Sequence, residues 1–288
     1  MELDMIPKAI CDITEAIRYT KDNIYRTHCE NTIKSLRSSI KFKVPTDGVI
    51  VSPISDLKND VKSVLRLPYP NMSVEIPISH GDSPFCICLA REVHKDNISD
   101  VLRMDSSDAT GAFTMSSVVL DQRSGKFMLS AFKVVALTGS TDQEDGKLLP
   151  AFPIPAMSCS LRDVGITDSQ AVNDYSIDLT ALMNLSLASM MSGAKETVHE
   201  KRKGFFKGKR GVKSEFFEYR TIDVQSSGSN HSGESSGGDA RNGPRLHLRR
   251  GHVRKISDNR LTWVRHAIVG DRQKGIIMKD YSIKKAGE

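Results

Sequence analysis

The stretch that decides the fold class is 112–137, which reads AFTMSSVVL, then DQRSGK, then FMLSAFKVVAL. Two runs rich in β-branched and aromatic residues flank a polar segment, 121–126, that contains Gly125. Such runs favour extended strands, and a short polar segment with glycine between them is typical of a β-hairpin. The sequence therefore predicts two antiparallel strands in the middle of the chain.

More strands are predicted on either side of this hairpin. Met72, Val74 and Ile76 alternate with polar residues, which is the two-residue period of a strand with one buried face. Residues 85–90 form a short apolar run that places Cys86 and Cys88 on one face of a strand. The other predicted strands are 50–51, 216–224, 246–256, 261–269 and 276–283.

Two segments have the period of a helix. Isoleucine and leucine over 5–39, and leucine and methionine over 174–191, recur mostly every three or four residues. A shorter helix is predicted at 56–66, and 139–170 is expected to be irregular. A helix as long as 5–39 needs a cover for its apolar stripe, so it packs on the body or forms a homodimer with a second copy. The predicted fold class is α+β, with a long N-terminal helix, an antiparallel sheet body and a basic, β-rich C-terminal part.

Composition divides the chain into three regions. The predicted α+β body is 1–200, a basic run and a flexible Ser- and Gly-rich loop form 201–243, and 244–288 is a basic, β-rich C-terminal part. The C-terminal strands are also compatible with completing the sheet of the body, which would make one domain with a long insertion.

Cysteine usage and hydropathy indicate a cytoplasmic protein. The five cysteines are an odd number without a Cys-x-x-Cys pair, so neither a disulfide framework nor a four-cysteine zinc site is predicted. No apolar run approaches the roughly 20 residues of a membrane helix, and the N-terminus lacks the features of a signal peptide. P-loop, dinucleotide-binding and nucleophile-elbow motifs are absent, so no cofactor is expected. No metal is expected because HExxH, zinc-spaced cysteine and EF-hand patterns are missing, and the hydropathy indicates no membrane partner.

Charge is distributed unevenly along the chain. Residues 1–194 carry 19 Lys and Arg against 24 Asp and Glu, a net charge of −5. Residues 195–288 carry 22 against 11, a net charge of +11. A strongly positive end on an acidic body is typical of polyanion binding, although a solvated tail that only aids solubility has the same composition.

The positive charge is concentrated in two segments. The first, 201–213, holds seven positive charges and no negative one. Its cations could contact phosphates while Phe205 and Phe206 stack on a base, and an exposed, solvated loop is the alternative. The candidate phosphate-binding residues of this run are Lys201, Arg202, Lys203, Lys207, Lys209 and Arg210.

The second basic segment is Arg245-Leu-His-Leu-Arg-Arg-Gly-His-Val-Arg254. Arginine can hold a phosphate through two parallel hydrogen bonds, and a neutral histidine can take or give a proton near pH 7. If 246–256 is one strand, Arg250, His252 and Arg254 share a face, and His247 lies on the other unless a bulge at Gly251 shifts the register. The candidates are His247 and His252 for catalysis, and Arg245, Arg249, Arg250, Arg254 and Arg265 for phosphate binding.

Two short motifs carry a family resemblance. The first is Leu65-Arg-Leu-Pro-Tyr-Pro70 with the following strand that contains Glu75, and the second is His247-Leu-Arg-Arg-Gly-His252 followed by Trp263. Together they resemble a family of small proteins encoded by tailed bacteriophages and prophages. This resemblance implies an early or accessory role in a phage, acting in the cytoplasm of the host cell, and it implies no particular reaction.

Three hypotheses on function follow from these patterns. The leading one is a phage accessory protein that binds nucleic acid, or a host nucleic-acid enzyme, through 201–213 and 245–265. The second is a metal-independent nuclease or phosphotransferase that uses His247 and His252. The third is a structural or protein-binding phage component that forms a homodimer through its N-terminal helix.

Overall fold

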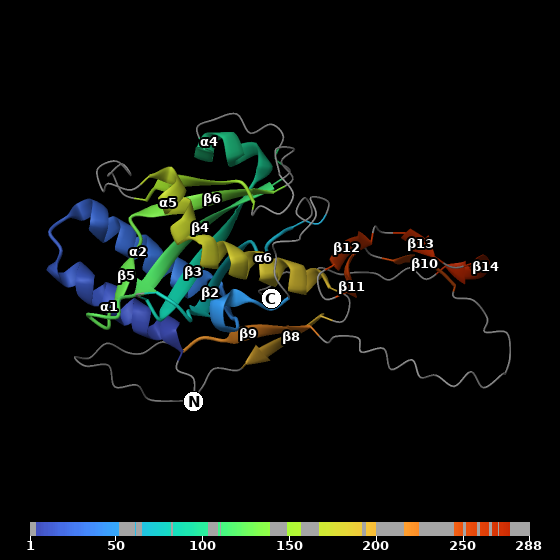
Figure 1. Ribbon diagram of the computed structural model, residues 1–288, viewed down its shortest axis with the longest axis horizontal. Helices are drawn as coiled ribbons and strands as arrows, with labels where there is room; N and C mark the ends of the chain where they lie inside the picture. The colour runs from blue at the N-terminus through green and yellow to red at the C-terminus, as the bar shows by residue number, and fades with distance from the viewer. Residues whose placement is uncertain are drawn as a thin grey trace.

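In the computed structural model, a large mixed sheet lies between two layers of helices (Figure 1). The structure describes residues 4–51, 61, 65–81, 83–102, 109, 111–138, 149–156, 167–191, 194–199, 216–224, 245–249, 252–257, 260–264, 267–269 and 271–276. The predicted helix at 56–66 falls almost wholly outside these residues, as do the basic run 201–213 and the Ser- and Gly-rich segment.

The described helices and strands are as follows. The helices are α1 (Met5–Tyr19), α2 (Asn23–Ser38), α4 (Ile98–Leu102), α5 (Asp168–Asp174) and α6 (Ser176–Met190), with short 3₁₀ turns η1 (Thr46–Gly48) and η3 (Lys95–Asn97). The strands of the large sheet are β1 (Ile40–Lys43), β2 (Asn71–Pro77), β3 (Phe85–Val93), β4 (Gly111–Leu120), β5 (Phe127–Leu129), β6 (Phe132–Thr138), β7 (Ala151–Pro155), β8 (Ala194–His199) and β9 (Tyr219–Val224). The C-terminal strands are β10 (Arg245–Arg249), β11 (His252–Ser257), β12 (Arg260–Val264), β13 (Ala267–Val269) and β14 (Asp271–Ile276).

The large sheet has the strand order β7-β6-β4-β3-β2-β1-β9-β8, and β5 also pairs with β4. Most neighbours are antiparallel, including the predicted hairpin formed by β4 with β5 and β6. Strand β1, however, pairs in parallel with both β2 and β9. The predicted α+β class is confirmed, but the sheet is mixed, which corrects the prediction of an antiparallel sheet. Parallel neighbours are joined by long connections, and no local pattern signals them.

The single long helix predicted over 5–39 is wrong, because the chain reverses between α1 and α2. The Asp22 carboxylate accepts hydrogen bonds from the backbone N–H groups of Ile24 (2.8 Å) and Tyr25 (3.2 Å), so it caps a new helix. The reversal brings the apolar stripes of both helices onto the same face of the sheet, around Ile87 and Leu89. The sheet of the same chain therefore covers these apolar stripes, so the helices do not need a second copy for that purpose.

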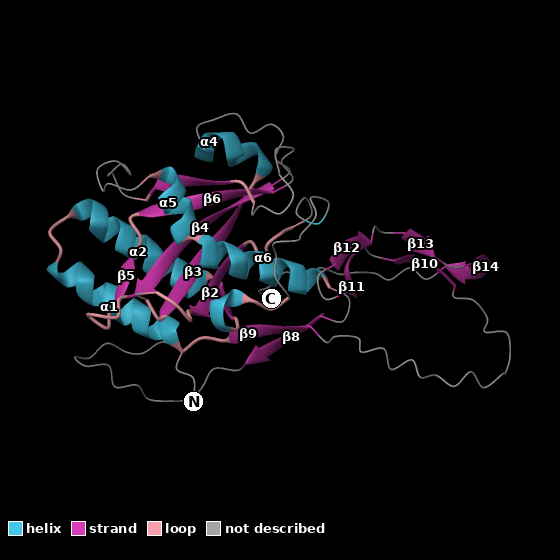
Figure 2. Cartoon of the chain, in the orientation of Figure 1, coloured by secondary structure: helices cyan, strands magenta, loops and turns pink. Residues whose placement is uncertain are grey.

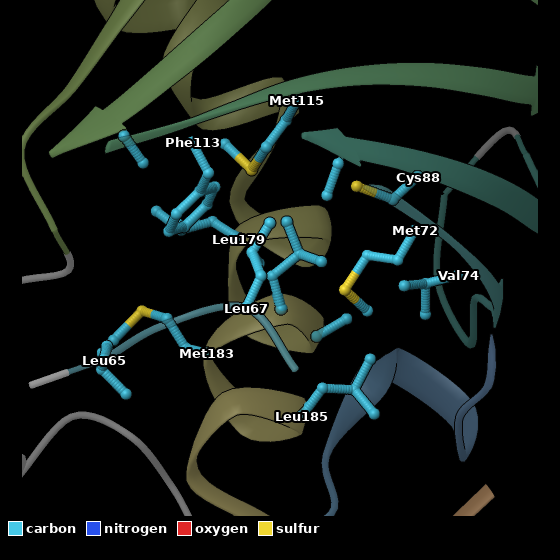
Figure 3. Packing of buried hydrophobic residues seen from close by; sticks show 14 of the residues in the cluster. Leu65, Leu67, Met72, Val74, Cys88, Phe113, Met115, Leu179, Met183 and Leu185 are labelled. Carbon is cyan, nitrogen blue, oxygen red and sulfur yellow. The ribbon is translucent and has the colours of Figure 1, made fainter. Parts of the chain in front are cut away.

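The opposite face of the sheet is covered by α6, as predicted for an apolar helix packed in the core. Ten of its fifteen residues are buried, and its apolar residues lie all around the helix. Leu179, Met183 and Leu185 lie in one hydrophobic cluster with Met72, Val74 and other buried side chains on this face of the strands (Figure 3). The leucines and methionines of this helix therefore form the core.

Two local predictions are corrected near this core. Ile50 and Val51 do not form a strand, because their backbone N–H groups donate to the buried side chain of Asn184 at 3.1 and 2.8 Å. The region 139–170 is not wholly irregular, since β7 extends the sheet at its edge next to β6. Prolines are tolerated in β7 because an edge strand need not donate every ladder hydrogen bond.

The described C-terminal part consists of strands only (Figure 2). They form one three-stranded sheet, β13-β10-β14, and one two-stranded sheet, β11-β12, so they do not complete the large sheet. By contrast β9, which lies beyond residue 200, is an inner strand of the large sheet. The body therefore extends past the boundary at residue 200 that composition suggests.

Candidate nucleic-acid interface

The basic run 201–213 lies in the connection of a β-hairpin at the edge of the large sheet. Strands β8 and β9 pair in antiparallel register from Ala194↔Val224 to His199↔Tyr219. The run lies within the connection from His199 to Tyr219, and both ends of this connection are held by the same pair of strands. Edge strand β8 itself carries two exposed basic side chains, Lys195 near its start and His199 at its end.

Polar contacts fasten this hairpin to the proline-rich segment before β2. Arg220 on β9 forms an ion pair with Glu196 on β8. Its Nη1 also donates to the hydroxyl of Tyr69 (2.8 Å), which in turn donates to the Glu196 carboxylate (3.0 Å), and the guanidinium lies 5.1 Å from the centre of the Tyr69 ring. These contacts hold a planar cation on an aromatic face, and they fix the hairpin to the body.

The C-terminal end of the same connection is anchored to the opposite face of β1. The Lys41 ammonium lies 4.3 Å from the centre of the Phe217 ring. The buried Tyr219 hydroxyl donates to Oε1 of Glu75 (2.7 Å), the oxygen that also accepts from the backbone N–H groups of Met5 and Ile6 (2.8 Å each). A carboxylate at the first turn of α1 thus joins α1, β2 and β9.

Glu75 is nevertheless almost fully buried, and burial raises its pKa to about 7. The hydrogen bond from Tyr219 and the helix N–H groups act in the other direction, and so does the Lys43 ammonium, 3.9 Å from Oε2. Burial is the larger effect because the Lys43 ammonium is beyond hydrogen-bond distance of Glu75 and donates to Asp4 instead. The three donors to Oε1 can also bind the protonated acid.

The second basic segment is fixed to the body through β11. Val253 is fully buried in the main core, and it forms a parallel bridge with Met191, directly after α6. The next residue, Arg254, is exposed. Because side chains alternate along a strand, docking of Val253 on the core turns Arg254 toward solvent.

The two basic segments leave the body at opposite ends of the β8–β9 hairpin. Met191, which bridges to β11, lies three residues before β8 and accepts a backbone hydrogen bond from Ala194. The run 201–213 begins after His199, at the other end of β8. At a rise of about 3.3 Å per residue, the six-residue strand β8 sets these two points about 17 Å apart.

The structure corrects the prediction that 246–256 is one strand. His247 belongs to β10, where it pairs with Val269, whereas His252 belongs to β11, where it pairs with Val264. The two strands lie in different small sheets, because the chain breaks its ladder between Arg249 and His252. Within the described residues, the continuous strand that the face assignment assumed is therefore absent, and the structure does not unite the two histidines on one element. His252 and Arg254 still lie two residues apart on β11, whereas Arg250 falls outside the described residues.

The other predicted phosphate-binding residues divide between described and undescribed parts. Arg245 and Arg249 lie at the two ends of β10. The remaining candidates fall outside the described residues: Lys201, Arg202, Lys203, Lys207, Lys209, Arg210, Arg250 and Arg265. Arg254 is thus the predicted cation for which the structure gives both a strand position and an exposed side chain.

Two further properties concern the described residues alone. Within them, no three His, Cys, Asp or Glu side chains come together in a group that could hold a metal ion. None of the described helices combines the length and the hydropathy needed to cross a membrane.

The anchoring contacts were not predicted from the sequence. Residues such as Arg220 and Glu196 are ordinary charged residues in an alternating strand, and only the pairing of β8 with β9 brings them together. Val253 carries the one available signal, since it is an apolar residue between the polar residues His252 and Arg254 in a predicted strand.

Comparisons with protein-family models, with curated proteins and with solved structures find no match to this chain.

Proposed function

We propose that this protein binds nucleic acid through the phosphate backbone, using the basic segments at 201–213 and 245–265. The observation that carries the proposal is the opposite charge of the two parts of the chain, −5 over 1–194 and +11 over 195–288. The phosphate backbone attracts clustered Lys and Arg without requiring any fixed motif, and binding releases condensed counterions. The acidic body repels the same backbone, which confines contact to the basic third.

The contacts described above support this proposal. A basic strand contributes most when its cations are held in place, because less side-chain and backbone freedom is lost on binding. Val253 anchors β11 in the core and leaves Arg254 in solvent, and the β8–β9 ladder holds both ends of the connection that contains 201–213. Phe205 and Phe206 within that run supply rings that can stack on unpaired bases.

A role in a bacteriophage belongs to the same proposal and rests on the resemblance of the Leu65–Pro70 and His247–His252 motifs alone. In that setting the protein is an early or accessory component in the host cytoplasm, and its nucleic-acid ligand is of the phage or of the host.

Fluorescence anisotropy with a labelled DNA duplex, a labelled single strand and a labelled RNA, measured across a range of salt concentrations, tests the proposal. We expect affinity to fall steeply as salt rises. The triple variant Arg249→Ala, Arg250→Ala, Arg254→Ala should bind more weakly, with a salt dependence reduced by about three phosphate contacts at most.

The matched control removes three exposed arginines from the acidic body: Arg18→Ala, Arg91→Ala and Arg123→Ala. It changes the net charge by the same amount, so it should leave affinity nearly unchanged if binding is local to the basic third. Absence of binding at low salt would reject the proposal, and so would an equal loss of affinity in the two triple variants.

A further inference from the structure

A polar cleft lies between α2 and the large sheet, on the face away from α6. Its volume is about 380 Å³, within the range of small-molecule sites. Side chains of α2 form one wall, and residues of β3, β4 and β6 form the other. The lining residues are Asn23, Ile24, Thr27, His28, Asn31, Thr32, Ser35, Leu89, Ser116, Lys133 and Ala156.

The electrostatics of this cleft favour an anion. Lys133 is the sole Lys or Arg among the lining residues, which include no Asp or Glu. Within the described part of the chain, Lys133 has no ion-pair partner and no hydrogen-bond acceptor for its ammonium. The Asn31 amide and the Ser116 hydroxyl supply further neutral donors, while the Thr27 hydroxyl donates to the Asn23 carbonyl (2.9 Å) and can only accept.

His28 adds a fixed acceptor to the same wall. It is over nine-tenths buried, and its Nε2 lies 3.2 Å from the backbone carbonyl of Ser130, which can only accept a hydrogen bond. Nε2 therefore carries the proton and Nδ1 keeps its lone pair. Burial lowers the pKa of His28, and the Lys133 charge lowers it as well, so the ring is neutral at pH 7.

We propose that this cleft binds a small phosphate monoester with a hydroxylated body, the class that includes sugar phosphates and nucleoside monophosphates. A single ammonium beside neutral hydroxyl and amide groups suits a phosphate, because a phosphate offers several acceptor oxygens that a lysine can contact as a point charge while the neutral groups bind the rest. The asparagine amides can donate to and accept from the hydroxyl groups of the ligand, and Nδ1 of the neutral His28 ring can accept from them. The volume is sufficient for one such molecule.

Isothermal titration calorimetry with ribose 5-phosphate, AMP, inorganic phosphate and unphosphorylated ribose tests the proposal on the full chain. We expect saturable binding of the two monoesters, weaker binding of inorganic phosphate and none of ribose. Lys133→Met keeps the length of the side chain and removes its charge, so it should weaken monoester binding about tenfold or more. Lys126→Met removes an exposed lysine outside the cleft and should bind as the unmodified protein does.

Two more measurements keep the test decisive. Thr27→Tyr fills the cleft from an exposed helix position without touching Lys133, and it should also abolish binding. In NMR titrations a bound phosphate should raise the pKa of the His28 ring, since it offsets the Lys133 charge. Monoester binding that survives Lys133→Met or Thr27→Tyr would overturn the proposal, as would ribose or inorganic phosphate binding as tightly as ribose 5-phosphate, or no binding of the monoesters at all.

Discussion

Gly48 sits at a point where backbone conformation and packing both exclude a side chain. Its φ is +72°, and a Cβ added there would lie 2.4 Å from the Cβ of Ala181 on α6. Gly48→Ala should therefore lower the free energy of unfolding by about 2–4 kcal/mol, from left-handed strain and from overpacking together. Chemical denaturation monitored by circular dichroism measures this loss.

Gly125 provides the matched control for that substitution. Its φ is also positive, at +63°, but nothing lies within 4 Å of an added Cβ. Gly125→Ala should cost only the conformational strain, about 1 kcal/mol. If the two variants lose the same stability, the close packing against Ala181 is not the reason that position 48 requires glycine.

Glu75 should make stability depend on pH in a direction opposite to that of most carboxyl groups. Burial raises its folded pKa to about 7 from the ordinary 4.5, so between these values the folded chain holds a proton that the unfolded chain has lost. The resulting stability is fully present below pH 4.5 and is lost as pH rises through about 7. The loss reaches about 3 kcal/mol, since each pH unit in that window is worth about 1.4 kcal/mol.

Urea unfolding between pH 5 and pH 8 tests this with Glu75→Gln, which keeps an acceptor oxygen for Tyr219 and the α1 N–H groups. The variant should lose most of the pH dependence and be the more stable protein at pH 8. Buried Asp178, whose pKa burial raises to about 6, leaves a residual slope of the same sign at lower pH. Glu30→Gln, at an exposed position, should keep the original profile, and a profile unchanged in Glu75→Gln would refute the role of Glu75.

Two residues, Lys41 and Asn184, have burial and hydrogen-bond partners that cannot be predicted from the sequence. Lys41 reads as a solvent-facing position, yet it is buried, and its ammonium donates to the carbonyl of Ser39 at 2.6 Å. The strand β1 that carries it was not predicted, because two lysines in four residues conceal an inner strand. The buried Asn184 likewise satisfies the Ile50 and Val51 N–H groups, a partner more than a hundred residues away.

At the scale of elements, local sequence patterns predict whether a segment is a helix or a strand better than they predict which strands pair. The predicted hairpin around Gly125, the strands at 72–76 and 85–90 and the apolar helix near 174–191 are all confirmed, because their apolar residues follow the period of the element that forms. The helix over 5–39 failed because a spacing of seven between Ile17 and Ile24 suits one helix as well as two. Parallel pairing of β1 has no local signal at all.

The docking of β11 on α6 gives a prediction for an element. Val253→Asp buries an unpaired charge in the main core, so β11 and β12 should detach from the end of α6. Hydrogen exchange should then show loss of protection at β11 and β12 amides, while β2 to β4 keep theirs. Val198→Asp, at a 47% exposed valine in β8, is the control and should change the protection of neither group of amides. Equal protection in both variants would mean that Val253 does not hold the strand.

At the scale of the whole molecule, the sequence predicts how charge divides along the chain, and the fold determines where the two basic segments lie relative to the body. Composition alone shows that the positive charge gathers after residue 194. It does not show that the two basic segments leave the body from opposite ends of one hairpin, because this depends on the β8–β9 ladder and on the Met191–Val253 bridge. Nor does it show that His247 and His252 fall on different strands.

This arrangement predicts that nucleic-acid affinity depends on ligand length. The two segments are anchored about 17 Å apart, and a duplex advances about 3.4 Å per base pair, so only a stem longer than about 5 base pairs reaches both. DNA stem-loops of about 16 base pairs should bind about tenfold or more tightly than those of about 4, after correction for the number of overlapping sites. Anisotropy titrations at one low salt concentration measure the ratio.

Removing one segment should abolish this length dependence, which separates two-point binding from a simple effect of ligand charge. The variant Lys201→Ala, Arg202→Ala, Lys203→Ala leaves β11 docked and the hairpin ladder intact, so it should bind the short stem nearly as before and the long stem much more weakly. A total-charge effect would instead lower both affinities by the same factor. That result, or equal affinity for both stems in the unmodified protein, would show that the two basic segments do not act on one ligand.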